Sequence, residues 1–254
     1  MEEFLEDPAE KLAVLGEPIA EFRVGGRWLI QKLIAAPLLV LLGIALDLGV
    51  FWWGIRHGSR LLIFGVVLAV GGVMIAVRVY RSRGLRVVAF PEGFVRLHGQ
   101  QADAFFWDEI AAVRWNKVQG HWARIWEGSK KLVVQRASGK QIIFDDSLPQ
   151  LEKLGGIVEE RTLSHLLRQS LETFEDGETL YFGKLRADRH GLIYQKELLP
   201  WKEFQELQVS DDAVRIMKKG KWRAWQSVSK DDIPNCHVLQ ALVEHALRQR
   251  NASV

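Results

Sequence analysis

The sequence predicts an α+β protein in which a small strand-rich unit occurs twice, each copy closed by a C-terminal helix. Three observations predict this architecture. Two long apolar runs follow each other near the N-terminus, a short tryptophan motif occurs twice, and alternating segments precede an amphipathic segment at the C-terminus. Together they indicate two small β-barrels, with a two-helix membrane hairpin inserted into the first.

The composition limits the classes of protein to consider. The 254 residues fit one large domain or two small ones, and 48% hydrophobic with 26% charged residues is ordinary for a folded chain. A single cysteine excludes an intramolecular disulfide framework and a cysteine-based zinc cluster. The net charge of +3 permits attraction to anionic lipid or nucleic acid without implying either. The acidic start MEEFLEDPAEKL differs from the basic start of a secretory signal.

The two apolar runs have the length of membrane-spanning helices. Residues 33–53 form a run of 21 with one charge, Asp47, and residues 61–77 form a run of 17 with none. Because a helix needs about 20 apolar residues to cross a bilayer, we expect transmembrane helices at about 29–54 and 60–80. A buried core hairpin is the alternative, and two adjacent runs of this length argue against it. Tryptophans stand where an interfacial belt is expected, at Trp28, Trp52 and Trp53.

Basic residues predict the orientation of this hairpin. The connection, residues 54–60, is too short to hold a domain, so both flanks lie on one side of the membrane. The flanks carry seven basic residues, Arg23, Arg27, Lys32, Arg78, Arg81, Arg83 and Arg86, against two in the connection, Arg56 and Arg60. The positive-inside rule then predicts a multi-pass protein of the cell inner membrane, with both termini and both soluble domains in the cytoplasm.

Small residues on the second apolar run indicate close helix packing. Gly65 with Ala69, and Gly72 with Ala76, are spaced four apart, and Ala45 with Gly49 repeat this spacing on the first run. We expect the two helices to pack on each other, with association of two hairpins as the alternative. For Asp47 we expect pairing with Arg56 or Arg60, and a functional intramembrane acid is the alternative.

The repeated motif is Trp107-Asp108-Glu109-Ile110, which matches Trp201-Lys202-Glu203-Phe204. Flanking segments match in the same order: 16–22 with 177–183, 91–95 with 189–193, and 146–149 with 231–234. Gly16 and Gly93 are 77 positions apart, whereas Gly177 and Gly191 are 14 apart, an excess of 63. The 61 residues between Arg23 and Leu85 account for most of this excess. The predicted domains are therefore 1–23 with 85–173, the hairpin 24–84, and 174–254.

The module is clearest in its second copy. We expect an extended segment bent at Gly183, short strands at 191–195 and 196–201, and an alternating strand at 203–209. A hairpin turning at Lys219-Gly220 follows, and then a helix over 234–250 capped by Asp231 or Asp232. In the first copy, the closing helix is expected at about 157–173. Six or seven strands followed by one helix fit a split barrel closed by that helix.

This layout resembles the pleckstrin-homology (PH)-like fold, and in particular an uncharacterised bacterial family of two-pass membrane proteins with tandem PH-like domains. The resemblance is carried by GETLYFGKL, HGLI, PWKEFQEL and DDIPN and by their partners in the first copy. It covers nearly the whole chain, and its motifs are structural. It implies the fold, and by analogy with eukaryotic PH domains it implies phosphoinositide or peptide binding.

Motifs of common enzymes are absent from the sequence. It contains no GxSxG, no phosphate-binding glycine-rich loop and no HExxH. We interpret His237 and His245 as ordinary helix residues, Cys236 as a packing residue, and Asp145-Asp146 as a helix cap. The prediction is therefore a protein that is not an enzyme and has no cofactor and no metal.

Basic residues beside aromatic ones are the better candidates for a site. They are Lys218, Lys219, Lys221 and Arg223 on a turn with Trp222 and Trp225, Lys184, Arg186 and Arg189 on early strands, and Trp115, Trp122 and Trp126 in the first copy. A positive turn flanked by tryptophans can meet anionic headgroups, at roughly 1 kcal/mol per basic residue near the surface. For the turn, the alternative is a solvated turn over two core tryptophans. For Lys184, Arg186 and Arg189 it is an exposed strand edge that charge protects from pairing with other chains. For Trp115, Trp122 and Trp126 it is packing of the tryptophans in the core.

The expected function is that of a non-enzymatic, membrane-anchored scaffold or sensor whose PH-like domains bind a protein partner or an anionic lipid headgroup. The alternative is an accessory or oligomeric subunit of a membrane transporter or channel. Membrane lipid, and a protein partner or a second copy, are the expected partners. Nucleic acid is not expected, because the basic residues are dispersed. Trp107 and Trp201 are predicted to plug the barrels, and Glu109 and Glu203 to begin the following strands, on their outward side or at a turn.

Overall fold

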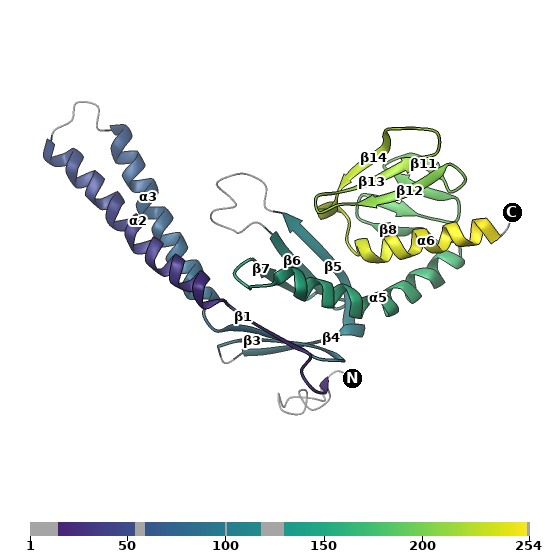
Figure 1. Cartoon of the computed structure of the whole chain (residues 1–254), viewed down its shortest axis with the longest axis horizontal. Coiled ribbons are helices and arrows are strands. Elements are labelled where there is room, and N and C mark those ends of the chain that lie inside the picture. Colours follow the sequence, from purple (N-terminus) through teal and green to yellow (C-terminus); the bar gives the residue numbers. More distant parts are fainter. Residues whose placement is uncertain (1–14, 54–58, 100, 118–129, 253–254) are drawn as a thin grey trace. The chain divides into compact units, whose positions relative to one another are not determined.

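A computed structural model describes residues 15–53, 59–99, 101–117 and 130–252 (Figure 1). Contacts group the chain into two compact units. One comprises residues 1–104, 119–129 and 146–150, and the other residues 105–118, 130–145 and 151–254. These units differ from the domain boundaries expected from the sequence, which stay a prediction. The architecture is mixed α+β, with several antiparallel sheets and an N-terminal pair of helices.

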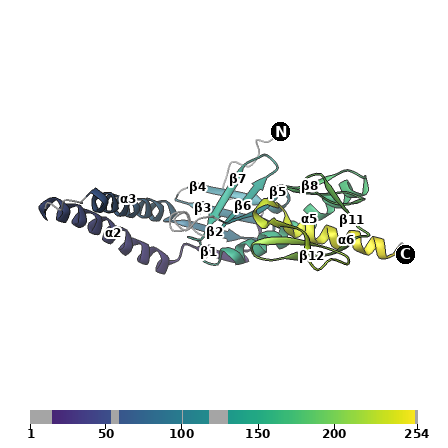
Figure 2. The same ribbon diagram turned by 90° about the horizontal axis from the view of Figure 1, so that it is seen from above.

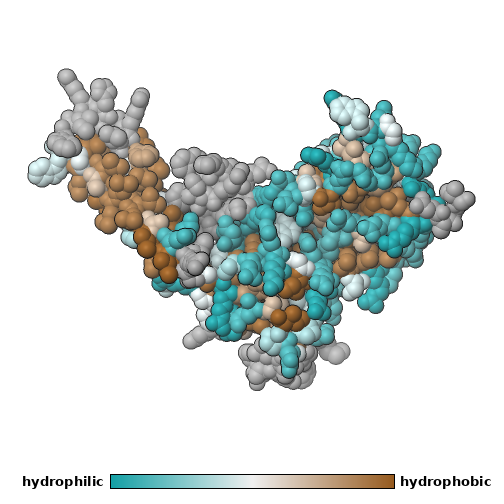
Figure 3. Space-filling model, in the orientation of Figure 1, coloured by the Kyte–Doolittle hydropathy of each residue, from teal (hydrophilic) through white to brown (hydrophobic). Residues whose placement is uncertain are grey.

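The first unit contains the two apolar helices, α2 (Gly26–Trp53) and α3 (Ser59–Ser82). They run alongside each other in both views (Figures 1 and 2). Their segments Ile30–Trp52 and Leu62–Ser82 are long and apolar enough to cross a membrane. Their surface is strongly hydrophobic (Figure 3). The predicted helix bounds are correct to within a few residues.

Glycines allow the two helices to approach closely. A Cβ atom on Gly72 would lie 2.7 Å from the carbonyl oxygen of Ala36, and one on Gly43 would lie 2.5 Å from that of Gly65. The small residues of α3 thus face α2, as expected, but they contact other residues than Ala45 and Gly49. A Cβ on Gly49 would meet nothing within 4 Å.

Asp47 lies in this helix interface. Its carboxylate is next to the Cα of Gly65, and its Oδ1 atom is buried without a hydrogen-bond partner among the described residues. The expected partners, Arg56 and Arg60, have side chains outside the described part of the chain.

The two helices connect neighbouring strands, β1 (Ala20–Arg23) and β2 (Leu85–Ala89), of a four-stranded antiparallel sheet. The sheet has the order β1, β2, β3 (Gly93–His98) and β4 (Gln101–Phe106). Arg23, at the end of β1, is opposite Arg86 on β2, and the Glu21 carboxylate forms ion pairs with both. The hairpin therefore follows the first strand, as the spacing of the glycines predicted.

The second unit begins with a one-turn helix, η1 (Trp107–Glu109). A three-stranded sheet of β5 (Ile110–Lys117), β6 (Lys130–Arg136) and β7 (Gln141–Asp145) follows, and then the helix α5 (Leu151–Glu175). The helix is longer than the predicted 157–173, because its apolar face already begins at Leu151 and Leu154, which are both buried.

The same series of sheets recurs downstream. A four-stranded sheet has the order β11 (Glu197–Pro200), β10 (Gly191–Tyr194), β9 (Leu185–Ala187) and β8 (Leu180–Phe182). A three-stranded sheet of β12 (Phe204–Val209), β13 (Ala213–Lys218) and β14 (Ala224–Ser229) follows, and then the turn η2 (Lys230–Asp232) and the helix α6 (Cys236–Ala252). Apolar side chains of both sheets, α5 and α6 form one core. Hydrogen bonds close neither pair of sheets into a barrel among the described residues, so the predicted closure is not found.

The Trp-x-Glu motif makes the same contacts in both places. Trp107 and Trp201 are 6% and 7% exposed. Glu109 pairs with Arg136 at 3.2 Å and Glu203 with Lys218 at 2.6 Å. The Glu109 and Glu203 carbonyls accept hydrogen bonds from the amides of Ala137 (2.9 Å) and Lys219 (2.8 Å). The tryptophan fills a core, and the glutamate holds the far end of the following strand pair.

Asn235 covers the free edge of β5, the outer strand of its sheet. Its side-chain oxygen accepts a hydrogen bond from the Val113 amide at 2.7 Å, and its side-chain nitrogen donates to the Ala111 carbonyl at 2.9 Å. Its own amide donates to the Val113 carbonyl at 2.8 Å. The residue has φ +52°, a conformation that asparagine tolerates better than most residues. A side chain thus satisfies backbone groups that an edge strand otherwise exposes.

Replacing Asn235 with glycine will lower the free energy of unfolding by about 1–3 kcal/mol, because glycine keeps the backbone conformation and removes both side-chain bonds. Gln195→Gly is the matched control, since Gln195 also has a positive φ, 54°, and is exposed. It should be neutral or slightly stabilising. Thermal unfolding of the full chain in detergent measures the stability of both variants relative to the wild type. Equal stabilities of the two variants would show that the edge contact contributes nothing.

Candidate functional site

Two of the predicted basic residues, Lys184 and Arg186, form contacts with neighbouring segments of the chain. Lys184 lies in the β8–β9 turn and pairs with Asp232 at 2.8 Å, which raises the pKa of its ammonium group. The turn approaches Asp232 closely because Gly183 has φ +65°, and a Cβ there would overlap the Asp232 carbonyl. Arg186 donates to the Gln195 carbonyl at 2.7 Å. These contacts use both side chains to fix the β8–β10 strands.

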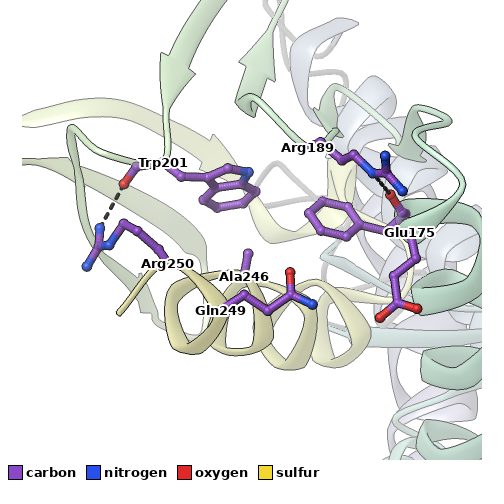
Figure 4. A pocket seen from close by; sticks show the side chains of 7 residues that line it. Glu175, Arg189, Trp201, Ala246, Gln249 and Arg250 are labelled. Carbon is purple, nitrogen blue, oxygen red and sulfur yellow. Dashed lines mark hydrogen bonds between the residues drawn. The ribbon is translucent and has the colours of Figure 1, made fainter. Parts of the chain in front are cut away.

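Arg189, the third of these residues, lines a pocket of about 450 Å³ (Figure 4). The pocket lies between the last turns of α5 and α6, and its lining comprises Phe174, Glu175, Arg189, Trp201, Ala246, Gln249 and Arg250. Arg189 donates to the Phe174 carbonyl at 3.3 Å, and Arg250 donates to the Trp201 carbonyl at 2.8 Å. Backbone oxygens thus orient both guanidinium groups.

The chemistry of this pocket is mixed. The rings of Phe174 and Trp201 meet edge to face at 6.4 Å and give it an aromatic wall. Two arginines supply positive charge, and the Glu175 carboxylate opposes them. The arrangement suits a small ligand or peptide segment that carries an apolar group and charges of both signs. It suits a polyanionic headgroup less well.

The turn between β13 and β14 and the residues next to it carry the other basic residues predicted for the site, Lys218, Lys219, Lys221 and Arg223. Trp222 is 82% exposed, and the Arg223 guanidinium lies over its ring at 4.4 Å. Lys219 and Lys221 are exposed beside it, whereas Lys218 pairs with Glu203. Trp225, by contrast, packs against the core. We call residues 218–225 the basic tip.

The basic tip therefore differs from a solvated turn over two core tryptophans. Trp222 is more exposed than any other large apolar side chain outside α2 and α3 among the described residues. Lys218, Lys221, Trp222, Arg223, Ala224 and Trp225 line a hollow of about 350 Å³. An exposed indole flanked by cations matches the chemistry of a bilayer interface, which accepts the ring and attracts the charge.

Of the tryptophans predicted for the first module, only Trp115 lies in the described residues. Its indole N–H donates to Glu159 at 2.8 Å, and a Cβ at Gly155 would overlap its ring. Trp115 therefore packs on α5 and is no surface for lipid, because its polar atom and its ring both have partners. Trp122 and Trp126 lie outside the described residues.

The buried cysteine Cys236 is a packing residue. Burial raises the pKa of the Cys236 thiol to about 11, so the thiol stays neutral and unreactive. The two predicted caps of α6 have other partners: the Asp231 carboxylate accepts a hydrogen bond from the Lys117 amide at 2.9 Å, and Asp232 pairs with Lys184. The described residues hold no cluster of metal-ligating side chains.

Sequence reasoning missed Arg250, Gln249 and Phe174, which complete the pocket around Arg189. They lie on the last turns of two helices about 75 residues apart, and no local pattern relates these turns. Only the packing of α5 on α6 brings them together.

Burial lowers the pKa of His237 to about 4, so this residue should give the protein a pH-dependent stability. The unfolded chain takes up a proton near pH 6.5 and the folded chain only near pH 4, so stability is complete above pH 6.5 and falls between these values. The loss is on the order of 1–3 kcal/mol at pH 4. Thermal unfolding at pH 7 and pH 5 should show a smaller difference for His237→Gln than for the wild type. His190→Gln, at an exposed position, should leave the difference unchanged.

Comparison with known proteins places the chain in a family. A family model described as "Family of unknown function (DUF6585)" matches residues 6–252. No curated protein matches the chain. Because the match spans nearly the whole chain, the protein belongs to this family of unknown function.

Proposed function

We propose that the protein is a non-enzymatic, membrane-anchored scaffold or sensor. In this proposal, α2 and α3 form a hairpin in a bacterial inner membrane, and both termini with two PH-like modules are cytoplasmic. The basic tip of the second module binds anionic lipid headgroups. The observation that carries the proposal is the exposed apolar surface of the helix pair.

That surface supports membrane insertion over a core hairpin. Only 17% of the α2 span and 29% of the α3 span are buried within the protein. Large apolar side chains such as Leu41 and Ile63 are more than half exposed. Soluble proteins rarely leave apolar patches of this extent in water, because each exposed Å² costs roughly 25 cal/mol. The excess of basic residues on the flanks supports the cytoplasmic orientation.

Three repeated details support two copies of one PH-like module. Each half has a four-stranded sheet, then a three-stranded sheet, then a long helix. The pairing register shifts directly after Ile110 in one half and directly after Phe204 in the other. The residue before each closing helix has a positive φ, 61° at Gln150 and 52° at Asn235. A duplicated module explains why these details recur at matching positions.

A second candidate function is that of an accessory or oligomeric subunit of a transporter or channel. Asp47 favours it, because the buried Oδ1 atom of this carboxylate lacks a partner among the described residues. The packing of α3 on α2 through Gly43, Gly65 and Gly72 uses the small residues within one hairpin, which favours the anchoring role.

Trypsin cleavage of the full chain in vesicles tests the role of the basic tip. Docked on lipid, the tip should be cleaved at least about fivefold more slowly in vesicles containing phosphatidylglycerol than in phosphatidylcholine alone. Cleavage at Arg248, which is exposed in the same module, provides the internal reference. High salt should restore cleavage, because it screens the attraction.

The matched variants are Trp222→Ala and Tyr181→Ala, which each remove an exposed aromatic ring from the second module. Only Trp222→Ala should abolish the protection. Equal cleavage of the tip in both kinds of vesicle would contradict the proposed lipid binding.

A further inference from the structure

A groove of about 610 Å³ runs between α2 and α3 at the ends that join β1 and β2. Its lining comprises Lys32, Leu33, Ala36, Pro37, Ala76, Val77, Val79, Tyr80, Arg81 and Arg83. The volume lies in the range of small-molecule pockets. Nine of the ten lining residues belong to the N-terminal half of α2 or to the end of α3, and the tenth, Arg83, directly follows α3.

The floor and walls of the groove are apolar. Ala36 and Val79 are buried and form its floor, whereas Leu33 and Tyr80 are exposed at its sides. Small residues open the space, because Ala36 and Ala76 fill little of it and Gly72 brings the helices together next to Ala36. The result is an apolar slot on a surface that the proposed function places in lipid.

One end of the slot is positively charged. Lys32 is in the second turn of α2, Arg81 is in the last turn of α3, and Arg83 directly follows α3. No acidic residue lines the groove, and no ion pair joins these three cations to an acid within the described part of the chain. The slot therefore offers hydrocarbon contacts along its length and three cations at the expected level of the headgroups.

We infer that the groove binds one anionic phospholipid, with an acyl chain in the apolar slot and its phosphate beside Lys32, Arg81 and Arg83. This inference rests on the proposed membrane insertion of the hairpin. Charge selects the occupant, because three cations near the low-dielectric core need a counter-charge, and the phosphate of a zwitterionic lipid is already neutralised by the lipid's own ammonium group. The phosphodiester of an anionic lipid has no such internal cation, so it supplies the counter-charge and accepts hydrogen bonds from both guanidinium groups.

Native mass spectrometry of the detergent-solubilised full chain tests this site, with phosphatidylglycerol and phosphatidylcholine as probes. We expect one phosphatidylglycerol molecule to bind at least about fivefold more tightly than phosphatidylcholine. The double variant Arg81→Gln/Arg83→Gln should lose this preference. Arg23→Gln, which removes a nearby basic residue outside the groove, should keep it.

A second pair of variants distinguishes lipid binding in the groove from attraction of lipid to positive charge on the protein surface. Ala76→Phe fills the slot while keeping every cation, and it should abolish the bound lipid. Ala45→Phe adds the same ring at an exposed position of α2 outside the groove and should have no effect. Equal binding of the two lipids to the wild type, or an unchanged preference in Ala76→Phe, would overturn the site.

Alkaline extraction of the membranes from which each preparation comes distinguishes this inference from the proposed function. A chain that stays in the membrane pellet but shows no lipid preference would refute the groove alone. A chain that alkaline washing releases would refute both the inserted hairpin and the lipid site that depends on it.

Discussion

The apolar surface of α2 and α3 is the constraint on which the rest of the structure depends. Two helices of this length cannot leave most of their side chains in water, so they need a bilayer or a partner of equal hydrophobicity. They also need each other, because Gly72 and Gly43 bring backbone against backbone. The first residues of α2 and the last residues of α3 must then connect to the sheet side by side. The pairing of Arg23 on β1 with Arg86 on β2 brings these two connections together, and the Glu21 carboxylate forms ion pairs with both cations.

The strand-rich part of the chain depends on a contact that occurs twice. Trp107 and Trp201 each directly follow a strand of a four-stranded sheet in sequence and are buried, and the glutamate two residues later pairs with a basic residue at the end of β6 or β13. The ion pairs are partly exposed, so their main effect is on register and turn geometry rather than on stability. The motif is therefore structural, and the proposed recognition uses residues outside it, such as Trp222 and Arg189.

Local patterns predicted most of the elements, because each depends on a short stretch of chain. Apolar runs predicted α2 and α3, alternation predicted β12, and the Lys219-Gly220 pair predicted the turn between β13 and β14. The contacts of individual side chains depend on distant residues. Nothing near Trp115 indicates Glu159 as its partner, and nothing near Asp231 indicates the Lys117 amide.

The candidate site was also hard to predict, because it too depends on contacts between residues that are distant in the sequence. Sequence periodicity placed Trp222 and Trp225 on opposite faces of a strand, but it could not tell which face meets the core. Charge alone did not separate Lys184, which pairs with Asp232, from Lys221, which is exposed on the basic tip. The groove beside Lys32 and Arg81 joins residues about 50 positions apart and exists only once the hairpin has formed.

Cysteine labelling in right-side-out membrane vesicles tests the central claim most directly, which is that α2 and α3 cross a bilayer as a hairpin. A membrane-impermeant maleimide would be applied to His57→Cys, in the connection, and to Lys219→Cys, on the basic tip. The native Cys236 is buried and contributes no signal. The account predicts labelling of position 57 in intact vesicles and of position 219 only after permeabilisation. Labelling of both positions from the same side would contradict it.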